Sequence, residues 1–106
     1  MRTALKDREL ERLVSALCAD YERREQALSL GTVSRRTALE YKYLNYKIRA
    51  AVESAVGERD AERFIRDIGN NTGYAKTELD YYSESVYKRR KAEAKYGIAK
   101  CLHLVD

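Results

Sequence analysis

The sequence of 106 residues has no proline and no tryptophan, and it contains only five glycines. Proline and glycine are the residues that most often end a helix or form a turn, so their scarcity predicts a helical chain with short connections. The apolar fraction of 44% and the charged fraction of 36% suit amphipathic helices better than the thick core of an α/β fold. We therefore expect one all-α domain over residues 1–106, in which all helices share a single core.

Histidine occurs once, at His103 near the C-terminus, so a Ser-His or Cys-His pair has only one candidate base. The sequence has no HExxH and no paired CxxC, and Cys101-Leu102-His103 is too short a cluster to hold zinc alone. The glycines fit no phosphate-binding loop. We therefore expect no enzymatic activity, no metal, no cofactor and no small-molecule substrate.

Only two cysteines are present, Cys18 and Cys101, and each falls in an apolar stripe. We expect both to be reduced and buried, because free cysteine behaves as a small hydrophobic residue; a disulfide between the first and last helices is the alternative. Residues 1–7 lack the apolar region of a signal peptide, and no stretch approaches a membrane span. These features predict a cytoplasmic protein without membrane association.

The N-terminal part of the chain carries apolar side chains at spacings of three and four residues. This pattern predicts one long amphipathic helix over about residues 4–29, with Tyr21 on its apolar face. Arg24 interrupts the apolar seam, and we expect its aliphatic stem to carry the charge past the edge of the seam.

A second long helix is predicted over about 34–56, with Tyr41 on its apolar face and therefore expected in the core. Gly31 is a stop for the preceding helix, Ser34 is a good cap for the new one, and Gly57 ends it. Since two long helices joined by a short turn pack side by side, the sequence predicts an antiparallel hairpin over residues 1–57.

Residues 58–106 have shorter periodic segments. They predict helices over about 58–68 and 74–82, and a final helix that begins at Ser83 or Ser85 and extends to about residue 102. We expect these three helices to form a compact unit that packs with the hairpin.

The most informative segment is residues 81–91, in which capping serines precede Val86, a tyrosine and four consecutive cations. Hydroxyl groups and helix N-termini position proteins on phosphates, while Arg and Lys supply salt-dependent affinity for nucleic acid. The net charge of +4 permits such a partner. The segment therefore favours binding to double-stranded DNA.

The same segment can be interpreted as a helix-turn-helix unit. Residues 58–68 would support it, 74–81 would be its first helix, 82–84 the turn and 85–102 the recognition helix. With Val86 anchored inward, the side chains expected to face DNA are Ser83, Ser85, Tyr87, Lys88, Arg89 and Lys91.

Within that set, Arg89 is the expected base contact, because Arg is the usual partner of guanine and Lys that of phosphate. Glu84 either accepts a hydrogen bond from a cytosine amino group or only favours the helix N-terminus.

The stretch from Glu78 to Lys91, followed by Ile98-Ala99-Lys100-Cys101-Leu102, resembles the C-terminal end of phage late-operon transcription regulators of the ArpU/RinA type. Those proteins are related to the promoter-reading fourth region of sigma factors. The resemblance covers about the last third of the chain and implies binding to promoter DNA of phage or mobile-element genes. The sequence departs from the pattern at Tyr82, where many helix-turn-helix units carry glycine.

Other interpretations of these features stay open. The N-terminal helices would pair two subunits if the DNA site is palindromic. Alternatively, the protein is a non-catalytic phage protein-interaction module, an assembly component or an inhibitor of a host nucleic-acid enzyme. Its contact surface would then include the long helices and the tyrosines that lie among cations, Tyr43, Tyr46 and Tyr87. The basic run 88–91 can also be a solvated helix face, and residues 74–102 can form one uninterrupted helix.

Overall fold

The computed structural model of the protein describes residues 5–105, and their regular secondary structure is entirely helical. No strand occurs in this range, which confirms the all-α prediction; residue 4, where the first helix was expected to begin, lies outside it. The helices, in chain order, are α1 (Arg8–Ala19), α2 (Tyr21–Leu30), α3 (Arg35–Val56), α4 (Glu58–Asn70), the 3-10 turn η1 (Tyr74–Lys76) and α5 (Glu84–Cys101). Between residues 5 and 105, none of them has the length and apolarity that a membrane crossing requires.

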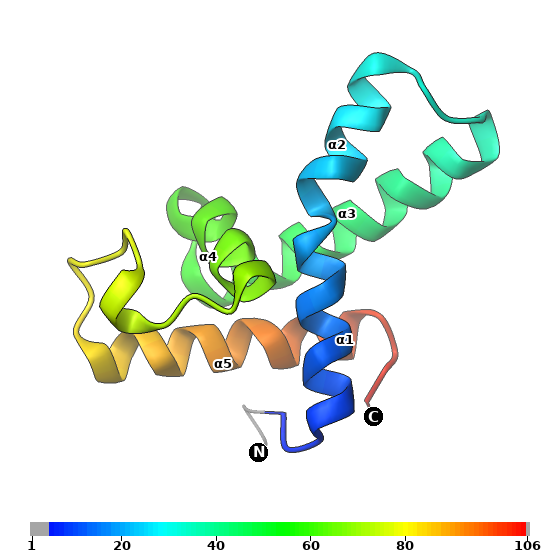
Figure 1. Cartoon of the computed structure of the whole chain (residues 1–106). Helices are drawn as coiled ribbons and strands as arrows, with labels where there is room; N and C mark the ends of the chain where they lie inside the picture. The colour runs from blue at the N-terminus through cyan, green and yellow to red at the C-terminus, as the bar shows by residue number, and fades with distance from the viewer. Residues whose placement is uncertain (1–4, 106) are drawn as a thin grey trace.

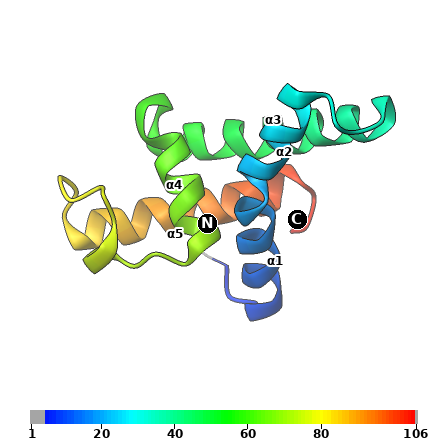
Figure 2. The same ribbon diagram turned by 45° about the horizontal axis from the view of Figure 1, so that its top comes forward.

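Helices α2 and α3 form an antiparallel hairpin that projects from the rest of the molecule (Figure 1). The second half of α3 packs on both α4 and α5, and α1 packs across α4 and α5 (Figures 1 and 2). The core lies where these four helices meet, and none of residues 25–44, which form the outer part of the hairpin, is buried. The hairpin predicted from the sequence is therefore present, but only its base shares the common core.

The first limb of the predicted hairpin is not one helix over 4–29, because the chain breaks at Asp20. This break lets α1 cross α4 while α2 follows α3. A close approach of two backbones accompanies it: a Cβ atom placed on Gly69 of α4 would lie 2.7 Å from the Ala19 nitrogen. The apolar spacing continues through Asp20, so the sequence pattern does not mark the break.

Arg24 is buried, with 3% of its surface exposed, so the expectation that its charge reaches past the seam is wrong. Its Nε donates to Asn45 Oδ1 at 2.6 Å, and its Nη2 donates to the Leu17 carbonyl across the break. Asn45 Nδ2 in turn donates to the Tyr21 carbonyl at 3.1 Å. Burial lowers the pKa of Arg24. These hydrogen bonds satisfy a guanidinium that the core would otherwise exclude.

The helix boundaries around the hairpin turn agree with the sequence prediction. Gly31 adopts the left-handed conformation at φ 64° that ends α2, and the Ser34 side chain accepts a hydrogen bond from the Thr37 backbone at 3.2 Å. Tyr21 is buried in the core as expected, whereas Tyr41 is only half-buried.

Both cysteines are free thiols, so no disulfide joins the first and last helices. Cys18 is buried and Cys101 is half-buried. Burial raises the pKa of the Cys18 thiol to about 12. The free state of both cysteines agrees with the expectation, but burial is confirmed only for Cys18, which acts as a small core residue.

The second half of the chain differs from the prediction between α4 and α5. The expected helix over 74–82 is replaced by the single 3-10 turn of η1 and by extended and turn conformations after it. Leu79 is nevertheless fully buried, because this connection folds back against the core.

Candidate nucleic-acid interface

The leading end of α5 is set by Ser83, whose Oγ accepts a hydrogen bond from the Val86 backbone at 3.3 Å. Before it, the chain turns through a backbone hydrogen bond from Tyr82 to Leu79. The bend predicted at 82–84 is therefore present, and residues 74–102 are not an uninterrupted helix.

Two carboxylates of α4 hold the connection before α5 in place. Asp60 accepts hydrogen bonds from the phenols of Tyr81 and Tyr82, the latter at 2.7 Å. Burial acts to raise the pKa of Asp60, but these hydrogen bonds and one from Arg59 lower it overall. Two turns along the same helix, Asp67 accepts from Thr77 Oγ1. These contacts give the residues after η1 an extended path along α4 in place of a helix.

Tyr87 is buried, with 1% of its surface exposed, so its expected exposure to DNA is wrong. Its phenol donates to Asp67 Oδ2 at 2.7 Å and lies 3.1 Å from the Thr72 carbonyl, and its ring stacks on Phe64 with centroids 5.5 Å apart. Burial raises the pKa of Tyr87. Val86, the expected anchor, is only half-buried. The inward face of α5 is therefore shifted by one residue from the prediction.

The last two cations of the basic run also point into the molecule. Lys91 Nζ donates to the Thr72 carbonyl at 2.6 Å, and burial lowers its pKa. Arg90 Nη1 donates to the Ala55 carbonyl at the end of α3 at 2.8 Å. These two side chains connect α5 to the end of α3 and to the segment that follows α4. Because Lys91 is engaged in this way, it is not free to contact DNA as expected.

The remaining predicted side chains, Ser83, Ser85, Lys88 and Arg89, are exposed on the leading end of α5. Lys88 pairs with Glu84 at 2.9 Å and Arg89 pairs with Glu93 at 3.7 Å. Exposed pairs of this spacing contribute only about 0.3–0.5 kcal/mol, so a phosphate group can displace the carboxylate. A contact between these residues and DNA stays a prediction.

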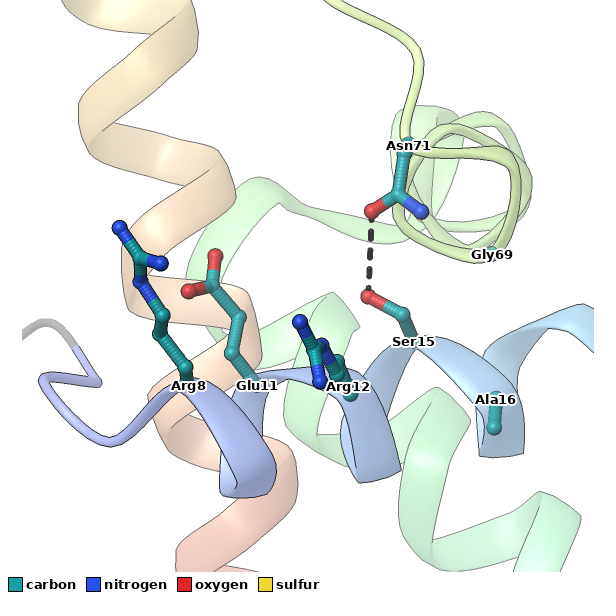
Figure 3. A pocket seen from close by; sticks show the side chains of 7 residues that line it. All are labelled: Arg8, Glu11, Arg12, Ser15, Ala16, Gly69 and Asn71. Atoms are coloured by element: carbon teal, nitrogen blue, oxygen red, sulfur yellow. Dashed lines mark hydrogen bonds between the residues drawn. The ribbon is translucent and has the colours of Figure 1, made fainter.

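A cleft of about 560 Å³ lies between α1 and the C-terminal end of α4 (Figure 3). Arg8 and Arg12 stand one helical turn apart on α1 along this cleft. Ser15 Oγ donates to Asn71 Oδ1 at 3.4 Å across it, and Asn71 adopts the left-handed conformation at φ 53°. The cleft thus combines two guanidinium groups with a hydroxyl and an amide, which are the groups that proteins use to bind phosphate.

Positive charge exceeds negative charge around this cleft. Its one carboxylate, Glu11, accepts a hydrogen bond from Lys95 of α5 at 2.8 Å. That bond, followed by the charges of Lys95, Lys91 and Arg8, lowers the pKa of Glu11. Within residues 5–105, neither Arg8 nor Arg12 forms an ion pair. Sequence reasoning did not select these arginines; their spacing of four residues on an amphipathic helix is the only signal that marks them.

The predicted helix-turn-helix unit lacks its first helix, since only η1 lies between α4 and α5. In the part of the chain that the structure describes, no three His, Cys, Asp or Glu side chains are grouped to hold a metal ion. No family model, curated protein or solved structure matches the chain. The resemblance of residues 78–102 to late-operon regulators therefore stays an interpretation of the sequence.

Proposed function

We propose that the protein is a non-catalytic DNA-binding protein that holds duplex DNA by its phosphates, through cations of α1 and α5. The observation that carries this proposal is the gathering of Arg8, Arg12, Lys91 and Lys95 around the single carboxylate of Glu11. The two lysines are engaged within the protein, so the arginines are the groups available to an external phosphate.

We name the cations of the cleft and those at the leading end of α5 the cationic track. Lys88, Lys91 and Lys95 follow one another at spacings of three and four residues, so they share one face of α5. Lys88 is the exposed member of this row, and Arg89 lies beside it. Since Lys91 and Lys95 are engaged within the protein, the groups of the track that can meet the regularly spaced phosphates of a duplex are its exposed members.

The more specific form of the proposal is a transcription regulator of phage or mobile-element genes. In this form the leading end of α5 enters the major groove, Arg89 contacts a base, and Ser83 and Ser85 contact phosphates. The free state of both cysteines accords with a cytoplasmic location for such a protein.

The test is fluorescence anisotropy with a labelled duplex of random sequence, measured between about 50 and 200 mM KCl. Two double variants, Arg8→Gln/Arg12→Gln and Lys88→Gln/Arg89→Gln, each remove two positive charges from the track. Each should weaken binding at least about tenfold at low salt and reduce the slope of log K against log salt by about 1–2, since each lost phosphate contact removes about 0.9 from that slope.

The matched control is Arg35→Gln/Arg36→Gln, which removes the same charge from exposed positions at the far end of the hairpin. It should change binding only slightly. Undetectable binding at low salt, or an equal loss in all three double variants, would contradict the proposal.

A second candidate function is the non-catalytic protein-interaction module. One observation favours it: three large apolar side chains of α3, Leu39, Tyr43 and Tyr46, are exposed. Exposed apolar surface of this kind marks a site of protein contact. Capture of a protein partner that depends on these side chains, together with an absence of DNA binding, would favour this candidate over the first.

A further inference from the structure

The outer face of α3 carries an apolar row that no other described segment covers. Leu39, Tyr43 and Tyr46 are 61%, 55% and 69% exposed, and Ala50 is also exposed. Their spacings of four, three and four residues are those of the seam of a coiled coil. We name these four residues the α3 seam.

The α3 seam is distinct from the face that α3 uses in the fold. The buried residues of the helix are Asn45, Ile48, Ala51 and Val52, which lie on the opposite side. A helix at the edge of a single domain normally exposes charged residues on its outer face, and α3 instead places two aromatic rings and a leucine there. The seam therefore has the composition of a helix–helix contact without its second helix.

We infer that the second helix is α3 of another copy of this chain, packed antiparallel in a two-fold dimer. A two-fold axis that passes between Tyr43 and Tyr46 of α3 places Tyr43 of each copy opposite Tyr46 of the other copy. The same operation places Leu39 opposite the small Ala50, so a large side chain meets a small one at both ends of the contact. A single self-complementary surface of this kind is what a two-fold interface requires.

The charges beside the seam match this pairing. At the ends of the seam, Arg36 of each copy comes opposite Glu53 of the other. Within one chain Arg36 pairs with Glu40 at 3.7 Å, and this exposed pair is weak enough for both groups to take partners in the second copy. Along one flank, Glu40 and Lys47 are seven residues apart, so they stand on the same side of the helix, and the reversal brings each Glu40 beside the second copy's Lys47. Four oppositely charged pairs would thus border the contact.

The other flank of the seam is balanced in a different way. The reversal brings Lys42 toward the second copy's Arg49, which bonds Glu53 of its own chain at 3.0 Å and would share that carboxylate with the incoming Arg36. The carboxylate of Glu25 on α2 lines the same groove as these cations. A parallel pairing would instead place Arg36 against Arg36 and Glu53 against Glu53, which disfavours it.

This inference does not depend on DNA binding, and its test is sedimentation equilibrium of the full chain from about 1 µM to 1 mM. The wild-type protein should shift with concentration from the 12.3 kDa monomer to twice that mass. The double variant Leu39→Ser/Tyr46→Ser should raise the dimer dissociation constant at least about tenfold. The control Leu13→Ser/Leu30→Ser removes exposed apolar side chains from α1 and α2 and should leave the constant unchanged.

A charge exchange tests the antiparallel register. Glu40→Lys and Lys47→Glu should each raise the dissociation constant about fivefold, because each single change places like charges side by side across the contact. The combination of both should restore the constant, because positions 40 and 47 of the two copies then again carry opposite charges. Within one chain these residues are two helical turns apart and do not pair, so restoration requires a second copy. The inference would be overturned by a monomer at all concentrations, by a dimer that the seam variants do not weaken, or by a failure of the exchange to restore the dimer. It would also be overturned if the monomer used the α3 seam to bind a different macromolecule.

Discussion

Tyr87 of α5 donates its phenol hydrogen to Asp67 of α4 over 2.7 Å, and this buried contact decides which face of α5 points outward. With Tyr87 inside, Arg90 and Lys91 also turn toward the body of the protein, and Lys88 and Arg89 remain at the surface. The tyrosine that lies within the basic run is thus a structural residue, and only part of the run is free to meet an anion.

The first prediction concerns this contact. Tyr87→Phe keeps the stacked ring but removes the hydrogen bond to Asp67, so the free energy of unfolding should fall by about 1–2 kcal/mol in urea titrations. DNA affinity, measured where the variant is folded, should be unchanged. The control is Tyr96→Phe, because the Tyr96 phenol makes no hydrogen bond within residues 5–105. A variant of normal stability that binds DNA less well would contradict the buried placement.

The second prediction compares two glycines inside helices. Gly69→Ala would place a Cβ 2.7 Å from the Ala19 nitrogen and 2.8 Å from its Cα, so α1 must move away from α4. Gly97→Ala would place a Cβ 3.6 Å from Ala51, which is ordinary contact. Thermal unfolding should show a loss of about 2 kcal/mol or more for Gly69→Ala, and no change or a gain of up to about 1 kcal/mol for Gly97→Ala. Equal effects would refute the close packing at Gly69.

The third prediction concerns the buried arginine. Asn45→Ala leaves the Arg24 guanidinium in the core without its main partner and should cost about 3 kcal/mol. Arg24→Met removes the charge and leaves only neutral acceptors unpaired, so its cost should be smaller, about 1–2 kcal/mol. Urea unfolding of the two variants measures the difference. The reverse order would show that Arg24 reaches solvent.

The fourth prediction is a loss of stability in alkali. In the folded protein the pKa of Cys18 is raised from 9.0 to about 12, so the folded state keeps a proton that the unfolded state loses above pH 9. Stability from this group is complete below pH 9 and should fall by about 1.4 kcal/mol per pH unit as the pH rises from 9 toward 12. Tyr82, whose pKa is raised from 10.0 to about 12 by burial and by Asp60, adds to the loss above pH 10.

Urea midpoints measured at several pH values between 8 and 11 test this prediction. Cys18→Ala should have a lower stability at pH 8 and a shallower decline above pH 9. A decline of equal steepness in Cys18→Ala and the wild-type protein would show that the thiol does not contribute.

The parts of the fold that local chemistry controls could be predicted from the sequence. Ser34 and Ser83 cap the helices that follow them, and Gly31 ends the helix before it. Each of these residues acts on backbone groups a few positions away, so the sequence alone contains the relevant partners. The all-α class and the bounds of α3, α4 and α5 follow from the same local signals.

The parts that depend on distant partners could not be predicted. Tyr87 is buried because its phenol donates to Asp67 and its ring stacks on Phe64. Arg24 is buried because Asn45 and the Leu17 carbonyl accept its hydrogen bonds. The helix expected over 74–82 was wrong because Asp60 binds two tyrosines from that segment. In each case a polar side chain elsewhere in the chain overrides the apolar spacing.

The outer part of the hairpin, residues 25–44, has no buried residue, and the Arg24–Asn45 contact lies just inside it. Opening of this part exposes little apolar surface, so it costs much less than global unfolding. Native-state amide exchange should therefore divide α3 at about Asn45: amides before it exchange through local fraying, whereas those from Ile48 to Val52 exchange only when the whole protein unfolds.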